Sequence, residues 1–193
     1  KALSIQFGTG NLLVDFSSAV LQQDFAVFVS DSAGNPVRDV AISAAAWPTM
    51  YRKGSYDWKR QAANQTTVEP GIWDVSPYAV DCDNEDIARR GVYERAFDRN
   101  GNGSLEPGIP LTVTTGGHTD ALGMTTVSLR YPRDRGNWVK VELTVSGTVA
   151  GTESRARNAF WLAVLSSDLS RYDVRPPGQP SPCGAGNSCY VAY

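Results

Sequence analysis

The sequence has little of what catalysis usually requires. Its 193 residues include one histidine, two methionines and three cysteines. A single histidine, His118, excludes a histidine-rich metal site and a histidine-paired nucleophile cluster. The chain has neither a Gly-x-Ser-x-Gly elbow nor a glycine-rich phosphate-binding loop. We therefore expect a protein that is not an enzyme.

Long apolar runs and an excess of one charge are also missing. The longest apolar run, 159–165, is about a third of a membrane span. The net charge of −2 gives no sequence-wide positive field to attract nucleic acid or an anionic membrane. With 41% hydrophobic and 10% aromatic residues, the composition is that of a globular protein. We expect neither nucleic-acid binding nor membrane insertion.

Where apolar residues recur, they alternate with a period of two, which is typical of β-strands. In Trp138–Val145 four side chains share one face: Val139, Val141, Leu143 and Val145. Further strands, separated by turn-forming residues, are predicted over 2–7, 24–30, 37–47, 124–131 and 154–165. Short strands with regular turns predict an all-β fold, an antiparallel β-sandwich.

The alternation of apolar residues is absent from two segments. Residues 48–110 form a predicted long irregular insertion, which is aromatic at first and then polar and glycine-rich. Residues 166–193 form a proline-rich tail that we expect to lie extended over the surface. The sequence thus predicts a single domain, residues 1–193, that carries this insertion and this tail.

The segment from 98 to 106 carries the clearest chemistry. Calcium takes about six to eight oxygen ligands, which a tight loop supplies from alternate positions. Residues with suitable oxygens stand at positions 1, 3, 5, 7 and 9: Asp98, Asn100, Asn102, Ser104 and Glu106. Ser104 would offer its backbone carbonyl, and the other four would offer their side chains. Gly103 stands at position 6, where the chain must turn. The spacing predicts an EF-hand-like loop that binds one Ca²⁺.

The loop departs from the EF-hand pattern at position 12, where Ile109 replaces the bidentate glutamate. The ion then needs oxygens from elsewhere, and the nearby candidates are Glu85, Asp86 and Glu94. A pair of carboxylates would also suit glycoside hydrolysis, but calcium ligation explains these acids better. The alternative for the whole segment is a hydrophilic Asn-Gly turn that binds nothing.

A second frame with the same spacing begins at Asp86, with Gly91 at position 6 and Glu94 at position 9. Positions 3 and 5, however, are Ala88 and Arg90. We interpret this upstream loop as a lapsed calcium loop in which the Arg90 guanidinium replaces the ion.

Several motifs resemble bacterial immunoglobulin-like domains of the invasin/intimin type. They occur at 25–40, 51–58, 82–86 (Cys-Asp-Asn-Glu-Asp), 119–153 and 176–182 (Pro-Pro-Gly-Gln-Pro-Ser-Pro). Their order is similar to that in exported Ig-like repeat proteins with a Cys-x-Asn-Glu-Asp calcium-loop insertion. The resemblance implies an Ig-like sandwich of about 100 residues plus the insertion and tail. It also implies an extracytoplasmic setting, at the cell surface, secreted or periplasmic, beside neighbouring Ig-like domains or subunits.

The resemblance further implies a Cys82–Cys189 disulfide that staples the tail to the sandwich, with Cys183 as the extra cysteine. The residues themselves leave a second pairing open, Cys183–Cys189, which would leave Cys82 free. The chain begins at Lys1 without a methionine or a signal-type hydrophobic segment, so we expect a processed or excised piece of a longer protein.

Together these features predict a non-enzymatic, calcium-stabilised structural or adhesive module. The alternative is a carbohydrate- or ligand-binding module, directed at a host or cell-surface glycan or protein. Its platform would be the aromatic rings of the insertion: Tyr56, Trp58 and Trp73. The competing interpretation of these rings is that they pack the insertion against the sandwich.

Overall fold

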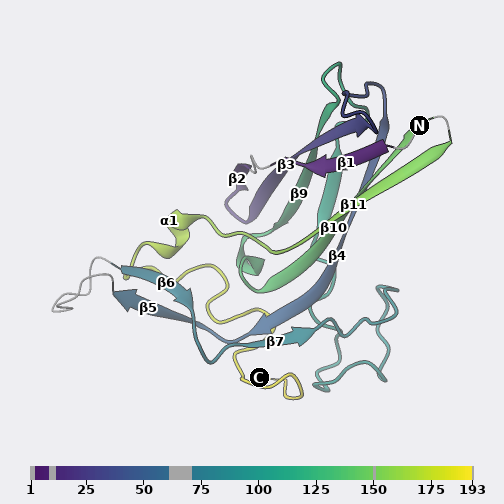
Figure 1. Ribbon diagram of the computed structural model, residues 1–193. Coiled ribbons are helices and arrows are strands. Elements are labelled where there is room, and N and C mark those ends of the chain that lie inside the picture. Colours follow the sequence, from purple (N-terminus) through teal and green to yellow (C-terminus); the bar gives the residue numbers. More distant parts are fainter. Residues whose placement is uncertain (1–2, 9–11, 61–70, 150, 193) are drawn as a thin grey trace. The chain divides into compact units, whose positions relative to one another are not determined.

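The computed structural model describes residues 3–8, 12–60, 71–149 and 151–192. Nearly all of the regular structure is β-strand, in antiparallel sheets with a sandwich-like arrangement (Figure 1). In these ranges the helical elements are a 3-10 turn, Arg133–Arg135, and one short helix, α1 (Ser166–Leu169). The predicted all-β sandwich is confirmed.

The first sheet has five strands in the order β1-β3-β9-β8, and β2 also pairs with β3. Its strands are β1 (Leu3–Phe7), β2 (Leu12–Ser17), β3 (Val20–Asp31), β8 (Thr112–Thr115) and β9 (Met124–Pro132). The antiparallel register places Ile5 opposite Val29 in β1–β3 and Val113 opposite Leu129 in β8–β9.

The second sheet has the order β11-β10-β4-β7, and a separate two-stranded sheet pairs β5 with β6. The strands are β4 (Ala41–Lys53), β5 (Tyr56–Arg60), β6 (Gly71–Val75), β7 (Val80–Asp83), β10 (Val139–Val149) and β11 (Thr152–Trp161). In β10 the residues from Val139 to Gly147 alternate between buried and partly exposed positions. The four side chains predicted to face inward from this strand are all fully buried.

The chain divides into two compact units, each with its own core. The first unit contains residues 1–47, 111–131 and 142–160, and the second contains 48–110, 132–141 and 161–193. The insertion and the tail therefore belong to the same unit. The core of the first unit includes Phe25, Val27, Val29, Leu129, Tyr131 and Leu143, and that of the second includes Tyr51, Tyr56, Trp138, Val141 and Leu162.

The insertion is more regular than predicted. Strand β4 continues to Lys53, and β5, β6 and β7 follow, so that the irregular part extends from 84 to 111 (Figure 1). The β5–β6 hairpin was missed because β6 shows no hydrophobic alternation and β5, in which Tyr56 and Trp58 alternate with Asp57 and Lys59, has only five residues. Strand β2 has no alternation either, since three apolar residues follow one another at 12–14. Of the predicted opening strand 2–7, residue 2 lies outside the described residues.

Candidate functional site

The Cys-Asp-Asn-Glu-Asp motif anchors the irregular part of the insertion. Asn84, Glu85 and Asp86 are all buried, with Glu85 fully so. The Asn84 backbone N–H donates to the Thr49 carbonyl at 3.1 Å, and its Nδ2 donates to the Pro48 carbonyl at 2.6 Å. The motif therefore fixes the start of the irregular segment 84–111 to strand β4.

The predicted calcium loop adopts a tight, inward-facing turn. The carboxylate of Asp98 accepts three backbone N–H groups, from Gly101 at 2.7 Å, Asn102 at 3.2 Å and Gly103 at 2.9 Å. Gly101 and Gly103 have φ values of 71° and 88°, which favour glycine. These hydrogen bonds, with one from the Tyr93 hydroxyl, hold the pKa of Asp98 below its ordinary value although partial desolvation raises it.

The polar side chains of this loop converge on the carboxylate of Glu106. Asn100 Nδ2 donates to Oε2 at 2.9 Å, while Asn102 Nδ2 and Ser104 Oγ donate to Oε1 at 2.8 and 2.7 Å. Positions 3, 5, 7 and 9 of the predicted loop are thus brought together. Ser104 Oγ also contacts Asn102 Oδ1 at 2.8 Å.

Of the acids predicted to complete the site, Glu85 is the one that contacts this loop. It accepts the backbone N–H of Glu106 at 3.1 Å and of Arg99 at 3.3 Å, and the hydroxyl of Tyr51 at 3.3 Å. Burial, together with the neighbouring Glu106 carboxyl, raises the pKa of Glu85 to about 7, although the backbone N–H donors of Glu106 and Arg99 act to lower it. Burial also raises the pKa of Glu106, but the donors from Ser104, Asn102 and Asn100 bring it below its ordinary value. At mildly acidic pH the pair therefore shares one proton, held on Glu85, and carries one negative charge.

This pair predicts a pH dependence of stability in calcium-free buffer. Because the pKa of Glu85 is raised in the folded state, the folded state binds more protons than the unfolded state between about pH 4.5 and 7. The free energy of unfolding should therefore fall by about 2 kcal/mol as the pH rises through that range. The pKa of Glu106 is lowered, so this residue stabilises the folded state throughout that range, and its contribution to the free energy of unfolding is lost only at more acidic pH. Urea unfolding with chelator across this range measures the fall.

The matched variants are Glu85→Gln, which removes the titrating group, and Asp83→Asn, an exposed acid two residues earlier. The Glu85→Gln protein should show a nearly flat profile, whereas Asp83→Asn should keep the wild-type slope. An unchanged slope in Glu85→Gln would show that Glu85 titrates normally.

The upstream loop repeats the backbone of the calcium loop. Asp86 accepts the N–H groups of Arg90 at 3.1 Å and Gly91 at 2.6 Å, at positions 5 and 6. Positive φ values again occur at positions 4 and 6, in Arg89 (54°) and Gly91 (68°). The Arg90 guanidinium pairs with Glu94 at 2.9 Å. Asp86 is thus held by backbone donors and Glu94 by the exposed Arg90 side chain, so both acids have their partners within the upstream loop.

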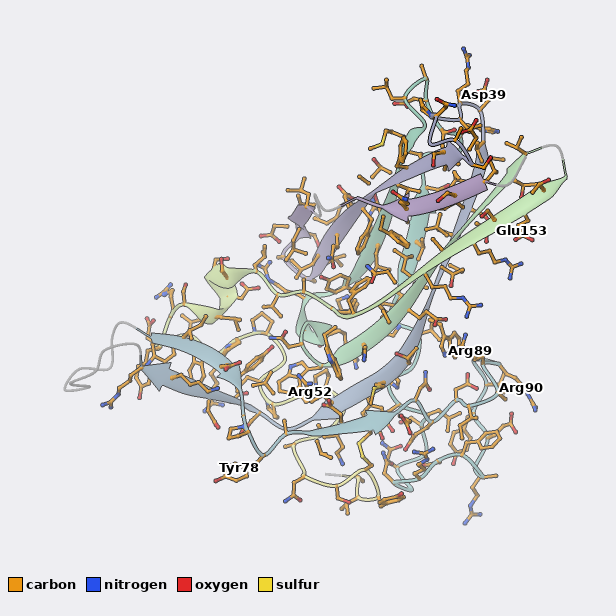
Figure 2. The ribbon with its side chains drawn as sticks, in the orientation of Figure 1. Asp39, Arg52, Tyr78, Arg89, Arg90 and Glu153 are labelled. Carbon is orange, nitrogen blue, oxygen red and sulfur yellow. A yellow bond between two sulfur atoms is a disulfide. The ribbon has the colours of Figure 1, made fainter. Side chains whose placement is uncertain are left out.

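Figure 2 shows Arg89 and Arg90 on this irregular part of the insertion. Among the described residues, no group of three or more histidine, cysteine, aspartate or glutamate side chains is placed to hold a metal ion. In the loop 98–106 the Glu106 carboxylate is surrounded by the amide nitrogens of Asn100 and Asn102 and by the Ser104 hydroxyl.

The cysteines pair as the resemblance implies. Cys82 and Cys189 form a disulfide with a Cα–Cα distance of 5.7 Å, which confirms one of the two pairings left open by the sequence. Cys183 is free and buried, and burial raises the pKa of its thiol to about 11. It packs in one cluster with Tyr51 and Cys82, with Cys189 against that cluster. A disulfide of this kind persists in oxidising compartments.

The three predicted platform rings do not lie together on a surface. Tyr56 is only 2% exposed, contacts Trp138 edge-to-face at 4.8 Å, and donates its hydroxyl to the Gly136 carbonyl at 3.2 Å. Burial raises the pKa of Tyr56 to about 12. Tyr56 is therefore a core residue. Its ring can be buried because the hydroxyl has a hydrogen-bond partner.

Trp58 and Trp73 face each other across the β5–β6 hairpin, with ring centroids 5.5 Å apart. Tyr172 of the tail joins them, 5.5 Å from Trp58 and 6.3 Å from Trp73. Trp73 Nε1 donates to the Arg171 carbonyl at 2.8 Å, and a Cβ on Gly71 would meet the Trp58 indole at 2.5 Å. Trp58 and Trp73 are thus partly buried, and they pack against each other and against Tyr172 of the tail.

Sequence reasoning missed Lys53, whose side chain is fully buried. Its Nζ donates to the Ser188 carbonyl at 2.9 Å and to the Val191 carbonyl, both in the tail. A lysine in an alternating strand is usually assigned to the solvent face. Only knowledge that the tail returns to β4 could have revealed its role.

No protein-family model matches the chain, and no curated protein matches it. No helix among the described residues is long and apolar enough to cross a membrane.

Proposed function

We propose that this chain is a non-enzymatic, extracytoplasmic structural or adhesive module whose insertion is rigidified by one calcium ion. The observation that carries the proposal is the convergence of loop positions 3, 5, 7 and 9, with Asp98 holding the turn from position 1.

Calcium would be held by Asp98, Asn100, Asn102, Glu106 and the Ser104 carbonyl. As a hard cation it would take the amide oxygens of Asn100 and Asn102 in place of the amide nitrogens that face Glu106. Glu85 is the acid best placed to add charge, since it contacts the loop through Glu106 and Arg99. Asp86 and Glu94 serve the upstream loop, so the proposed stoichiometry is one ion.

The rest of the module supports a mechanical role. A disulfide joins β7 to the tail across a sequence separation of 107 residues, and the insertion and tail form one compact unit with its own core. Cross-linking of irregular segments suits a module that resists unfolding outside the cytoplasm. Its proposed partners are neighbouring Ig-like domains or subunits, and a glycan or protein on a cell surface.

Calcium is expected to raise the melting temperature. For an extracellular-type dissociation constant of about 0.1–1 mM, roughly 10 mM calcium adds about 1.4–2.7 kcal/mol to the free energy of unfolding. Scanning calorimetry with calcium, and then with excess chelator, measures the shift.

The matched variants change position 1 of each loop. Asp98→Ala should abolish the calcium-dependent shift, whereas Asp86→Ala should retain it despite a lower baseline stability. Identical melting of the wild-type chain with calcium and with chelator would contradict the calcium proposal.

A further inference from the structure

A pocket of about 260 Å³ opens where three segments of the second unit meet. The turn after β4 contributes Gly54 and Ser55, the turn between β6 and β7 contributes Ser76 and Tyr78, and the tail contributes Asn187. None of the calcium-loop residues lines it. The pocket is therefore a candidate site separate from the one described above.

The walls of this pocket are fixed by backbone and covalent contacts. Gly54 donates its N–H to the Gly184 carbonyl and accepts the Ser181 N–H, both at 2.9 Å, while Ser76 donates its N–H to the Ser55 carbonyl at 2.9 Å. Gly54 has φ 140°, and a Cβ there would lie 2.8 Å from the Ala79 Cβ. The Cys82–Cys189 disulfide ties down the tail just beyond the pocket. Walls held in this way are ordered before a ligand arrives, which lowers the entropic cost of binding.

The chemistry of the lining is neutral and hydrogen-bonding. All eight lining residues are glycine, alanine, serine, tyrosine or asparagine, so none is charged. A charged ligand would lose water here without gaining an ionic partner, which disfavours it. Serine hydroxyls and an asparagine amide can each donate and accept, as the hydroxyl groups of a polyol require. The glycine and alanine residues of the lining let such groups approach the backbone closely.

Tyr78 supplies an apolar face at the rim. Its side chain is 82% exposed, and Figure 2 shows it pointing away from the ribbon at this end of the unit. An exposed ring beside neutral polar groups matches the two sides of a sugar, whose C–H face stacks on aromatics while its hydroxyls form hydrogen bonds. The volume lies somewhat below the usual range for drug-sized ligands, which suits one sugar ring.

We propose that this pocket binds the neutral terminal sugar of a glycan, with Tyr78 stacking on the ring and Ser55, Ser76 and Asn187 contacting its hydroxyls. A single ring in an open pocket binds weakly, with a dissociation constant of the order of 1 mM. Repetition of the module in a longer chain or assembly raises the overall avidity.

The experiment uses the full biotinylated chain, clustered on labelled streptavidin, on an array of neutral and sialylated glycans. The neutral glycans retained are then measured by saturation-transfer NMR. Wild-type protein should bind glycans with neutral termini. Tyr78→Ala and Asn187→Ala should each weaken binding about tenfold.

Tyr190→Ala is the matched control, because Tyr190 is a 73% exposed tyrosine of the same tail that does not line the pocket. It should bind as the wild type does, and circular dichroism should show all three variants folded. Wild-type affinity in both Tyr78→Ala and Asn187→Ala, no retention of any neutral glycan, or retention of sialylated glycans alone would overturn the proposal. The calcium melting experiment changes none of these residues, so each proposal can fail without the other.

Discussion

A Cys189→Ser variant is expected to lose about 4 kcal/mol of the free energy of unfolding, the largest effect we predict for a single substitution. The Cys82–Cys189 bridge closes a loop with a sequence separation of 107, and in the chain-entropy model such a long loop restricts the unfolded chain strongly. For a chain of this length the loss corresponds to a melting temperature lower by about 8–16 °C. Urea unfolding and calorimetry under non-reducing conditions measure it.

Cys183→Ala is the matched control for this prediction. Cys183 packs in the same cluster but forms no disulfide, so its replacement removes only the volume of a sulfur atom. We expect a loss of about 1 kcal/mol. Reducing agent should destabilise the Cys183→Ala protein as much as the wild type, and it should leave Cys189→Ser unchanged. Equal stabilities of Cys189→Ser and Cys183→Ala would show that the bridge adds nothing.

The parts of the fold that the sequence predicted are those in which one face of a strand is buried. Strand β10 alternates because Val139, Val141 and Leu143 pack inward while their neighbours are partly exposed. Strands β2 and β6 lack such a contrast, and β5 shows it over only five residues, although β2–β3 and β5–β6 both join strands that are neighbours in the sequence. Periodicity cannot detect a strand that has two similar faces.

In the candidate site, too, some features could be predicted from the sequence and others could not. The spacing of Asn100, Asn102 and Glu106 is local, so sequence alone could predict that their side chains would meet. How deeply each acid is buried, in contrast, depends on contacts with residues that are distant in the sequence. Glu85 is fully buried against Tyr51 and the downstream loop, whereas Glu94 turns to Arg90. The four arginines of this region alternate in sequence with acids, but the folded chain leaves Arg89, Arg90, Arg95 and Arg99 exposed while the acids accept hydrogen bonds inside the loops.

A Lys53→Met variant is expected to lose about 3 kcal/mol of the free energy of unfolding. The Lys53 ammonium donates to the carbonyls of Ser188 and Val191, and methionine fills similar space without a donor. The variant therefore leaves two tail carbonyls without this donor, and hydrogen bonds to charged groups are worth more than neutral ones. The tail should loosen beyond its disulfide, with faster amide exchange over 184–192.

The control is Lys59→Met, which changes an exposed lysine of the same unit that pairs with Asp74. An exposed pair of this kind contributes about 0–1 kcal/mol, so this variant should melt close to the wild type. Hydrogen exchange read by mass spectrometry separates a local from a global effect, since only Lys53→Met should raise exchange in the tail. A Lys53→Met protein as stable as Lys59→Met, with a protected tail, would show that packing and the Cys82–Cys189 bridge hold the tail without the ammonium. Because the same tail carries Asn187, loosening in Lys53→Met should also disorder one wall of the proposed sugar pocket, which links the buried lysine of β4 to any binding at that site.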